Sequence, residues 1–540
     1  MKKSLITAIC CLTQVAVASA QTLSPREEFL KRQQEVITQY KENAEKEYEQ
    51  FLEQRNSDYA NFMAQKWELY QTFKGVDQPI SPYPQEPVVK TNSSAVLTPV
   101  SLPIKKVIKT TAAKKVSPEF QRKSDREVPD LRKLFMANGG STSSGSTSTT
   151  TTPTTKPTTP TPTTPTTPVK KNLTQDPSAP KGFEFEYLGN KLAVGLSSSN
   201  IFTLKGTNEA TVSNMWKQLS NGSLSQAIDD CVYWKEALNL NDYLYVMMVD
   251  SMCDSFLGSS RQNEARLLKT YILNQSGYDA KCARCSQGLV MLLSFEESIY
   301  QKRYIKIDGS KYYILDEPKD SDNVYYTFSQ KFAEQSKSCS VKIEEEFVVN
   351  QNLAQSRVLT SRAYPNISIA AAVDKDLIAL YNNYPRCDWE IYAKAPMSIS
   401  LSNKVLPALR AEIAGKSETE AANMIINFVQ TAFAYKTDSD YFGYERSLFV
   451  DETFYYPYSD CEDRSILFTN LIQSLLGLDV VLLQYPDHLA TAVRFNSDYN
   501  GDHMIIGGKK YIICDPTYIG ANIGEAMPAY KRVSATIVML

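Results

Sequence analysis

Residues 458–477 read YSDCEDRSILFTNLIQSLLG, and this stretch decides how the C-terminal part of the chain is interpreted. Ser459 or Asp460 can cap a helix here, which would place Cys461 in the first turn. At that position free backbone N–H groups and the positive end of the helix dipole favour a thiolate over a thiol. Gly477 suits the end of the helix. The apolar residues recur at helical spacing and predict one buried face: Ile466, Leu467, Leu471, Ile472 and Leu475.

Three strands are expected after this helix. Residues 480–483 (VVLL) have the composition of a buried strand, and His488 stands at the head of a second apolar run. A turn at Gly507-Gly508 precedes a third run, residues 510–514, which ends at Asp515. The whole chain has only two histidines, and His488 is the one placed to meet Cys461.

A cysteine, a histidine and an aspartate on these elements suit nucleophilic catalysis. A thiolate attacks a carbonyl carbon, an imidazole activates it and then protonates the leaving amine, and a carboxylate holds the imidazole in one tautomer. A helix N-terminus also offers backbone donors for the oxyanion. The candidate catalytic residues are therefore Cys461, His488 and Asp515.

Residues 461–517 resemble the transglutaminase-like branch of the papain superfamily. The segment 460–463 (DCED) is similar to the family's G/D-C-x-D start, and 515–517 (DPT) is similar to its D-P-T/S segment. A helix expected from Ser417 to Tyr435, with a capping box formed by Ser417 and Glu420, resembles the helix that precedes the nucleophile in that family. The resemblance predicts a transglutaminase-like (papain-like) domain at residues 399–540.

The resemblance implies acyl transfer through a thioester, without a cofactor or a metal. We expect a cysteine-dependent peptidase or amidase that acts on peptide, isopeptide or cell-wall amide bonds. Two alternatives stay open: a non-catalytic surface binding or scaffold protein with a vestigial triad, and a true protein-glutamine transglutaminase. The second oxyanion donor is not placed by the sequence, and Tyr456 and Tyr458 are candidates.

Other cysteine and histidine positions favour structural roles. His503 follows a polar stretch and is expected in an exposed loop, while Cys514 should face the core because its neighbour Asp515 points the other way. Cys282 and Cys285 form a lone C-x-x-C, which fits a disulfide or two thiols better than zinc, since zinc needs four ligands.

A faint internal repeat precedes the candidate site. Under it, Arg261 stands in place of Cys461 and Gly288 in place of His488, so residues 181–320 are predicted to be a degenerate transglutaminase-like domain. Shifted by two hundred positions, Leu267, Ile272, Gly277, Asp279 and Leu289 match Leu467, Ile472, Gly477, Asp479 and Leu489. Shifted by one position less, Gly309, Lys311, Tyr312, Ile314 and Asp316 match Gly508, Lys510, Tyr511, Ile513 and Asp515.

The remaining segments complete an α+β fold class. Residues 1–20 read as a signal peptide, which predicts export to the periplasm, the cell surface or the medium. Residues 21–75 are expected to form a long amphipathic helix with an aromatic stripe, which docks on its own protein or else binds a partner or self-associates. Residues 76–180, rich in Pro, Thr and Ser, are expected to be a disordered linker. Residues 321–398 are expected to be a strand-rich connecting region.

The net charge of −2 carries no sign of a nucleic-acid-binding surface, and no segment after the leader is long and apolar enough to cross a bilayer. The expected partner is a peptide or protein substrate, with a cell-wall peptide among the candidates.

Overall fold

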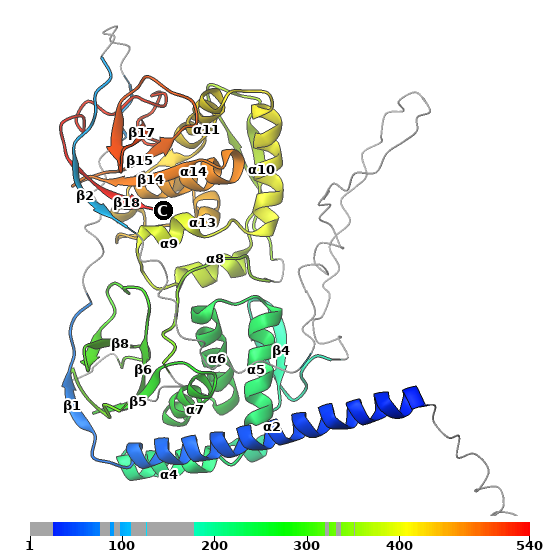
Figure 1. The fold of residues 1–540 in the computed structure, drawn as a ribbon. Coiled ribbons are helices and arrows are strands. Elements are labelled where there is room, and N and C mark those ends of the chain that lie inside the picture. The colour runs from blue at the N-terminus through cyan, green and yellow to red at the C-terminus, as the bar shows by residue number, and fades with distance from the viewer. Residues whose placement is uncertain are drawn as a thin grey trace, which may run out of the picture.

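The computed structural model describes residues 25–75, 87–90, 98–109, 126, 178–318, 323–330, 336–349 and 352–540. The expected signal peptide, residues 1–20, lies outside these residues. The described chain forms two lobes, one above the other, and a long N-terminal helix extends from the lower lobe (Figure 1).

The N-terminal lobe combines a six-stranded sheet with four helices. The helices are α4 (Glu209–Leu219), α5 (Ser225–Ala237), α6 (Asp242–Leu257) and α7 (Gln262–Gln275). The strands, in sheet order, are β1 (Glu68–Gln71), β9 (Val324–Thr327), β5 (Ala280–Cys285), β6 (Gly288–Ser294), β8 (Ser310–Ile314) and β7 (Tyr304–Ile307). A separate hairpin is formed by β3 (Phe183–Tyr187) and β4 (Asn190–Val194).

The C-terminal lobe has a second six-stranded sheet and more helices. The strands, in sheet order, are β2 (Ile104–Ile108), β18 (Ala535–Met539), β14 (Asp479–Gln484), β15 (Leu489–Arg494), β17 (Lys509–Cys514) and β16 (His503–Ile506). The helices are α8 (Lys375–Asn382), α9 (Trp389–Lys394), α10 (Ile399–Ile413), α11 (Glu418–Ala432), α12 (Asp438–Tyr441), α13 (Val450–Tyr455) and α14 (Cys461–Leu476). Two short pairs accompany them: β10 (Arg357–Thr360) with β11 (Ser368–Ala371), and β12 (Ala434–Tyr435) with β13 (Tyr458–Ser459).

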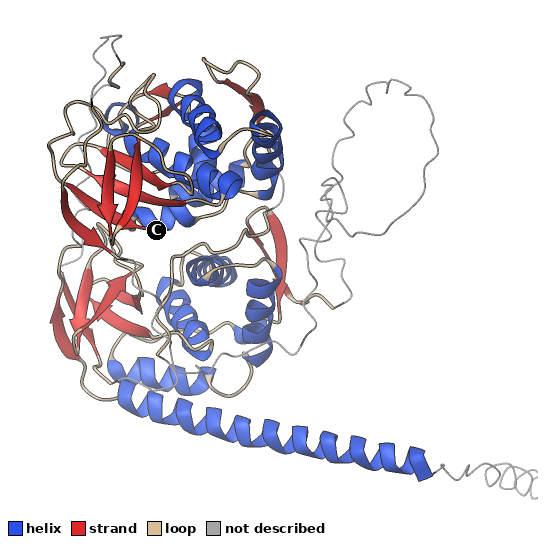
Figure 2. Ribbon diagram, turned by 45° about the horizontal axis from the view of Figure 1, so that its top comes forward, coloured by secondary structure: helices blue, strands red, loops and turns tan. Residues whose placement is uncertain are grey.

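In both lobes the sheet lies on one side and the helices lie on the other (Figure 2). Helix α7 packs on β5 and β6, and α14 packs on β14 and β15. Of the apolar residues predicted for the α14 face, four are fully buried and Leu475 is half-buried, which explains why this helix holds its place against the sheet: the four are Ile466, Leu467, Leu471 and Ile472. The predicted α+β class is confirmed.

The two sheets share one strand order, because β1-β9-β5-β6-β8-β7 corresponds to β2-β18-β14-β15-β17-β16. Their registers also correspond under the offsets of 200 and 199 positions found in the sequence. One difference is that β1 runs antiparallel to β9 while β2 runs parallel to β18. Equivalent residue pairs are Val480–Val493 and Ala280–Leu293, Ala492–Ile513 and Leu292–Ile314, and His503–Ile512 and Tyr304–Tyr313.

The N-terminal helix α2 (Pro25–Met63) is shorter than the helix predicted for residues 21–75. The indole of the buried Trp67 donates to the carbonyl of Met63 (2.9 Å) and so takes up one of the carbonyls left free at the helix end. Residues 68–71 then pair with β9 as strand β1. Near its end the helix is docked, with Tyr59 buried, whereas Tyr40 is 75% exposed.

Part of the expected linker 76–180 belongs to the C-terminal sheet. Strand β2 runs parallel to β18, so this segment is not a free tether. Leu102 is buried in a small apolar cluster on this sheet, and its N–H donates to the carbonyl of His503 (2.7 Å). His503 itself begins β16 and is half-buried, so the prediction of an exposed loop was wrong.

The expected strand-rich region 321–398 is not a unit of its own. Strand β9 completes the N-terminal sheet, β10 and β11 form a hairpin near α10 and α11, and two helices follow. Within this region residues 341–349 form no regular strand, because their backbone groups bond elsewhere. The N–H of Val341 donates to Glu297 (3.0 Å), and that of Val348 donates to the carbonyl of Leu238 (2.9 Å).

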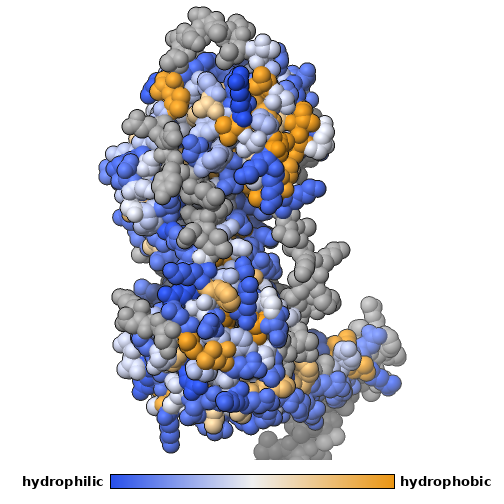
Figure 3. Space-filling model, turned by 90° about the vertical axis from the view of Figure 1, so that its left-hand side faces the viewer, coloured by the Kyte–Doolittle hydropathy of each residue, from blue (hydrophilic) through white to orange (hydrophobic). Residues whose placement is uncertain are grey.

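One large apolar core runs through both lobes. On the face turned to the viewer in Figure 3, apolar side chains form separate groups within a mainly hydrophilic surface. Among the residues that the structure describes, none of the helices has both the length and the apolar character needed to cross a bilayer.

Candidate active site

The first turn of α14 places Cys461 beside the head of β15. Cys461 is the first residue of this helix and so lies in the first turn, as predicted, and Gly477 ends the helix in a left-handed conformation (φ 65°). The hydroxyl of Ser465, one turn further along, donates to the carbonyl of Leu489 (3.0 Å), the first residue of β15. The N–H of Leu489 is also directed at the Cys461 sulfur, a bond that acts to lower the pKa of the thiol.

His488 and Asp515 form a buried pair, with exposed fractions of 4% and 3%. Nε2 of His488 lies 2.9 Å from Oδ2 of Asp515. The other carboxylate oxygen, Oδ1, accepts from the backbone N–H groups of Thr517 (2.9 Å) and Tyr518 (3.2 Å). These bonds fix the carboxylate, and they arise because Asp515 begins a turn at the end of β17.

The three sequence-predicted residues therefore come from adjoining elements. His488 directly precedes Leu489, whose N–H reaches the sulfur, and Asp515 directly follows β17, the neighbour of β15. Because Nε2 is committed to Asp515, Nδ1 is the ring nitrogen left for a sulfur.

The electrostatics around Cys461 favour the thiol in this arrangement. The residue is fully buried, and burial raises the pKa of the thiol well above its usual range, with Glu462 and Asp460 adding to the rise. The thiol donates to Oε2 of Glu462 (3.1 Å). This differs from the expectation that the helix N-terminus favours a thiolate.

Two tyrosines cover the imidazole of His488. The ring of Tyr530 stacks on it with centroids 5.0 Å apart and planes 20° apart, and Tyr485 lies beside both rings. The Tyr530 hydroxyl donates to Asp487 (3.1 Å), which holds this half-buried ring in place. Tyr530 thus forms part of the cover over the candidate site.

Gln430, on α11, holds the loop that carries Asp515, a role the sequence analysis missed. Its amide nitrogen donates to the carbonyls of Asp515 (3.1 Å), Tyr518 (2.8 Å) and Ala521 (3.1 Å). Its Oε1 accepts from the N–H of Gly520 (3.1 Å). A polar residue within the apolar face of a predicted helix was the available signal.

Of the two suggested oxyanion donors, Tyr456 has its hydroxyl engaged elsewhere and Tyr458 has its ring packed against a neighbour. The Tyr456 hydroxyl donates to Asn382 (2.9 Å), and the Tyr458 ring packs against Tyr441 with centroids 5.2 Å apart. The backbone N–H of Cys461, at the open end of α14, is the donor that the helix geometry offers.

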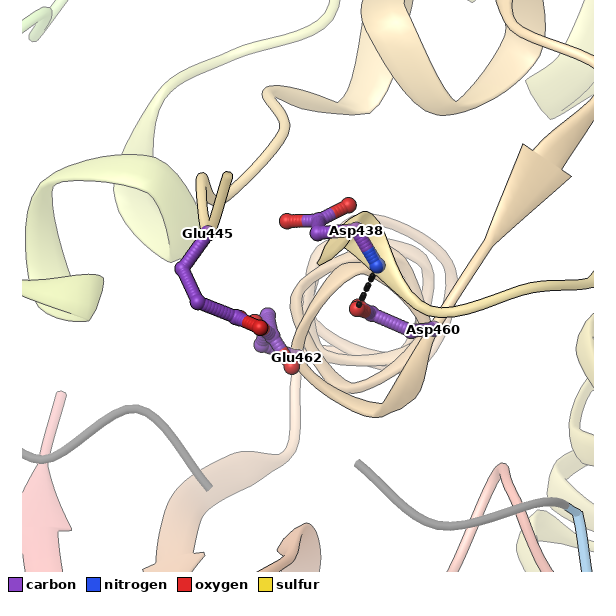
Figure 4. Close-up of side chains that lie close together, drawn as sticks. All are labelled: Asp438, Glu445, Asp460 and Glu462. Carbon is purple, nitrogen blue, oxygen red and sulfur yellow. Dashed lines mark hydrogen bonds between the residues drawn. The ribbon is translucent and has the colours of Figure 1, made fainter. Parts of the chain in front are cut away.

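Four acidic side chains gather around the start of α14: Asp438, Glu445, Asp460 and Glu462 (Figure 4). Burial and the neighbouring Asp460 raise the pKa of Asp438 to about 11. Burial and nearby carboxylates also raise the pKa values of Asp460 and Glu462 well above their usual range. These four residues are the ones that could hold a metal ion in the described part of the chain. The eight described cysteines are all free and buried, Cys282, Cys285 and Cys514 among them.

Comparisons with protein-family models, with curated proteins and with solved structures found no match to this chain.

Proposed function

We propose that the C-terminal lobe is a transglutaminase-like cysteine hydrolase with Cys461 as nucleophile, His488 as base and Asp515 as the residue that orients His488. The observation that carries this proposal is the 2.9 Å His488–Asp515 pair, next to a strand whose first N–H reaches the Cys461 sulfur. Helix start, strand head and strand end suit the three roles that the chemistry needs.

In the proposed reaction His488 accepts the thiol proton at Nδ1, and the sulfur attacks the carbonyl carbon of an amide. The backbone N–H of Cys461 donates to the oxyanion that forms. The imidazolium then protonates the leaving amine, which departs and leaves a thioester. Water, activated by His488, attacks the thioester, releases a carboxylic acid and restores the thiol.

The proposed substrate is a peptide, an isopeptide or a cell-wall amide that the protein meets outside the cytoplasm, in the periplasm, at the cell surface or in the medium. Hydrolysis is favoured over transfer to an amine because water is abundant and the sequence carries no sign of an amine-selective site. Release of ammonia with incorporation of an added primary amine into a glutamine-containing protein would instead indicate a transglutaminase.

We infer that residues 181–320, together with β1 and β9, are a second copy of the same unit that lacks the chemistry. The shared strand order and register support this inference. At the position of Asp515 the first copy keeps Asp316, and Asp316 pairs with Lys269 (2.8 Å) instead of a histidine. The proposed role of this first copy is packing or binding.

A second candidate function is a non-catalytic binding or scaffold protein. The complete burial of the Cys461 sulfur and its raised pKa favour this alternative. Iodoacetamide at mildly acidic pH separates the two: a Cys461 that reacts no faster than a free thiol there supports the scaffold.

The direct test compares wild type, Cys461→Ala and Cys514→Ala on peptide and peptidoglycan mixtures, read by mass spectrometry. Cys514 is a matched control because it is equally buried and adjoins Asp515. The proposal expects products from wild type and Cys514→Ala that Cys461→Ala does not release. Identical product patterns from all three proteins would remove the enzyme proposal.

A further inference from the structure

Four carboxyl groups converge at the open end of α14, although they come from three segments of the chain. Asp438 begins α12, Glu445 lies in the loop after it, and Asp460 and Glu462 flank Cys461. One oxygen of each lies within 4.8 Å of an oxygen of each of the others. Figure 4 shows the carboxylate of Glu445 meeting that of Glu462, with Asp438 and Asp460 beside them.

Such a group of like charges requires a compensating positive charge. Asp460 and Glu462 are fully buried, and Asp438 is nearly so, so water screens their repulsion poorly. Protons, a cationic side chain or a bound cation are the three ways to relieve it.

The neighbouring cationic side chains are committed to other partners. Arg446 donates to Glu452 and to Asn382. Arg464 donates to the carbonyls of Gln430 (3.3 Å) and Phe433 (2.8 Å). Within the residues that the structure describes, no lysine or arginine forms an ion pair with Asp438, Asp460 or Glu462.

Two buried oxygens in the cluster have no hydrogen-bond donor from the described chain: Oδ1 of Asp460 and Oε1 of Glu462. Their partner oxygens are satisfied, since Oδ2 of Asp460 accepts from the N–H of Asp438 (3.3 Å) and Oε2 of Glu462 accepts from the Cys461 thiol (3.1 Å). Buried acceptors are rarely left without a partner, so these two oxygens point to a ligand.

Capping of α14 explains only part of this cluster. Acidic residues in the first turn of a helix are common because they interact well with its dipole. Asp438 and Glu445, however, belong to other segments. Asp438 is also held in place, because its Oδ2 accepts from the N–H of Arg446 (2.8 Å).

We propose that Asp438, Glu445, Asp460 and Glu462 bind a calcium ion. The donors are all carboxylate oxygens, which suit a hard cation, whereas zinc is bound mainly by nitrogen and sulfur. Ca–O bonds of about 2.4 Å allow opposite ligands about 5 Å apart, whereas the shorter Mg–O bonds allow only about 4 Å. The oxygens all lie within 4.8 Å of one another, which a calcium ion can span, and four protein carboxylates suit calcium better than magnesium, which is usually held by one or two. Glu445, which is half-buried, is the ligand that links the site to solvent.

Two measurements on the full chain test the proposal. The first is calorimetric titration with CaCl2 after treatment with EDTA, and the second is thermal unfolding in EDTA and in Ca²⁺. We expect one ion per chain and a higher unfolding temperature in Ca²⁺. Asp438→Asn and Glu462→Gln should each weaken binding by at least about tenfold, because calcium affinity follows the number of charged ligands. Asp440→Asn is the matched control, since Asp440 lies on the same short helix but is exposed.

A variant could also lose calcium binding because it misfolds, and the unfolding temperature in EDTA distinguishes this case from the loss of a ligand. Asp438→Asn removes one of four carboxylates that repel one another, so in EDTA its unfolding temperature should equal or exceed that of wild type. No heat and no thermal shift for wild type up to about 10 mM Ca²⁺, which is about tenfold above the Kd of the weakest calcium sites, would overturn the proposal. Equal binding by wild type and both ligand variants, or a preference for Mg²⁺ or Mn²⁺, would also overturn it. No substrate enters this test, so its outcome is separate from that of the proposed hydrolase.

Discussion

Nε2 of His488 lies 2.9 Å from Oδ2 of Asp515, while Oδ1 of the same carboxylate is held by two backbone N–H groups. The backbone bonds fix which oxygen faces the ring. An ionised carboxylate only accepts, so Nε2 must carry a proton and Nδ1 is free to accept one. The pair therefore determines the tautomer that the proposed mechanism needs.

Asp515→Asn should abolish most of the proposed activity while keeping the fold. The carboxamide oxygen can still accept from Thr517 and Tyr518, which turns the amide N–H₂ toward His488. Nε2 must then accept, Nδ1 carries the proton, and the thiol loses its base. We expect a rate loss on the order of 10³-fold or more, by analogy with other triads. Turnover measured beside circular dichroism checks this, and an unchanged rate would contradict the assigned role.

Gln430→Met should loosen the loop that holds Asp515. Three buried carbonyls lose their donor and Gly520 loses its acceptor, so we expect a loss of about 2–4 kcal/mol in the free energy of unfolding. We also expect a lower kcat with little change in KM, because Asp515 orients the base rather than binding substrate. Urea denaturation and steady-state kinetics measure the two effects. Gln473→Met, at a half-buried position on α14, is the control and should change neither.

Tyr530→Ala should expose the candidate site, and Tyr530→Phe should not. The alanine variant removes the ring stacked on His488, while the phenylalanine variant keeps the ring and loses only the bond to Asp487. If Tyr530 limits access, iodoacetamide should label Cys461 at least about tenfold faster in Tyr530→Ala, which corresponds to an opening free energy lower by about 1.4 kcal/mol. Equal labelling rates for the two variants would mean that a group other than the Tyr530 ring limits access of iodoacetamide to Cys461.

The local parts of the site follow from the sequence. The pattern around Cys461 and Gly477 predicted the start and the end of α14, and the apolar runs before and after His488 predicted β14 and β15. The capping box of Ser417 and Glu420 also begins α11 as expected. These features depend on residues close in sequence, which periodicity and capping rules describe.

The long-range parts do not follow from the sequence. Strand β2 joins β18 across more than four hundred residues, and nothing in the sequence near Ile104 indicates that pairing. Asp438 and Glu445 join Asp460 only after folding, and the order of the strands was not predictable from their composition. The helix predicted for residues 21–75 was too long because a stripe of spaced aromatic residues does not distinguish Met63, the last helical residue, from Trp67, which packs beyond the helix end.

Stability should fall as the pH rises through the titration of Asp451. Burial raises the pKa of this carboxyl to about 6, although two bonds from Ser398 lower it. The unfolded value is near 3.8, so between about pH 4 and 6 the folded state binds more protons than the unfolded state, and stability decreases with pH. The difference amounts to about 3 kcal/mol.

Asp451→Asn tests this contribution. Glu452, whose pKa burial raises to about 7 against the effect of Arg446, should keep part of the pH dependence in the variant. We therefore expect the free energy of unfolding of Asp451→Asn to change less between pH 4 and pH 7 than that of wild type, as measured by urea denaturation at each pH. Parallel curves for the two proteins would mean that Asp451 titrates normally.

Lys269→Met should destabilise the N-terminal lobe without affecting the proposed chemistry. Lys269 is 3% exposed, and its ammonium group donates to Asp316 (2.8 Å) and to Asp250. Burial acts to lower the pKa of Lys269, but the two carboxylates outweigh it and the pKa is raised. The variant leaves two neighbouring carboxylates without their cation. Both are partly exposed, so we expect a loss of about 2–3 kcal/mol, less than the 3–5 kcal/mol typical of a fully buried pair.

Asp316→Asn in the Lys269→Met background should recover part of that loss, because it removes one of the unpaired charges. Asp316 occupies the place in the N-terminal sheet that Asp515 occupies in the C-terminal one. The same substitution at both positions therefore tests whether the aspartate at this place in the fold has a structural or a catalytic role. Asp316→Asn alone should shift the unfolding midpoint and leave turnover per folded molecule unchanged, whereas Asp515→Asn should do the reverse. A loss of turnover in Asp316→Asn as large as that in Asp515→Asn would mean that the first copy takes part in the chemistry.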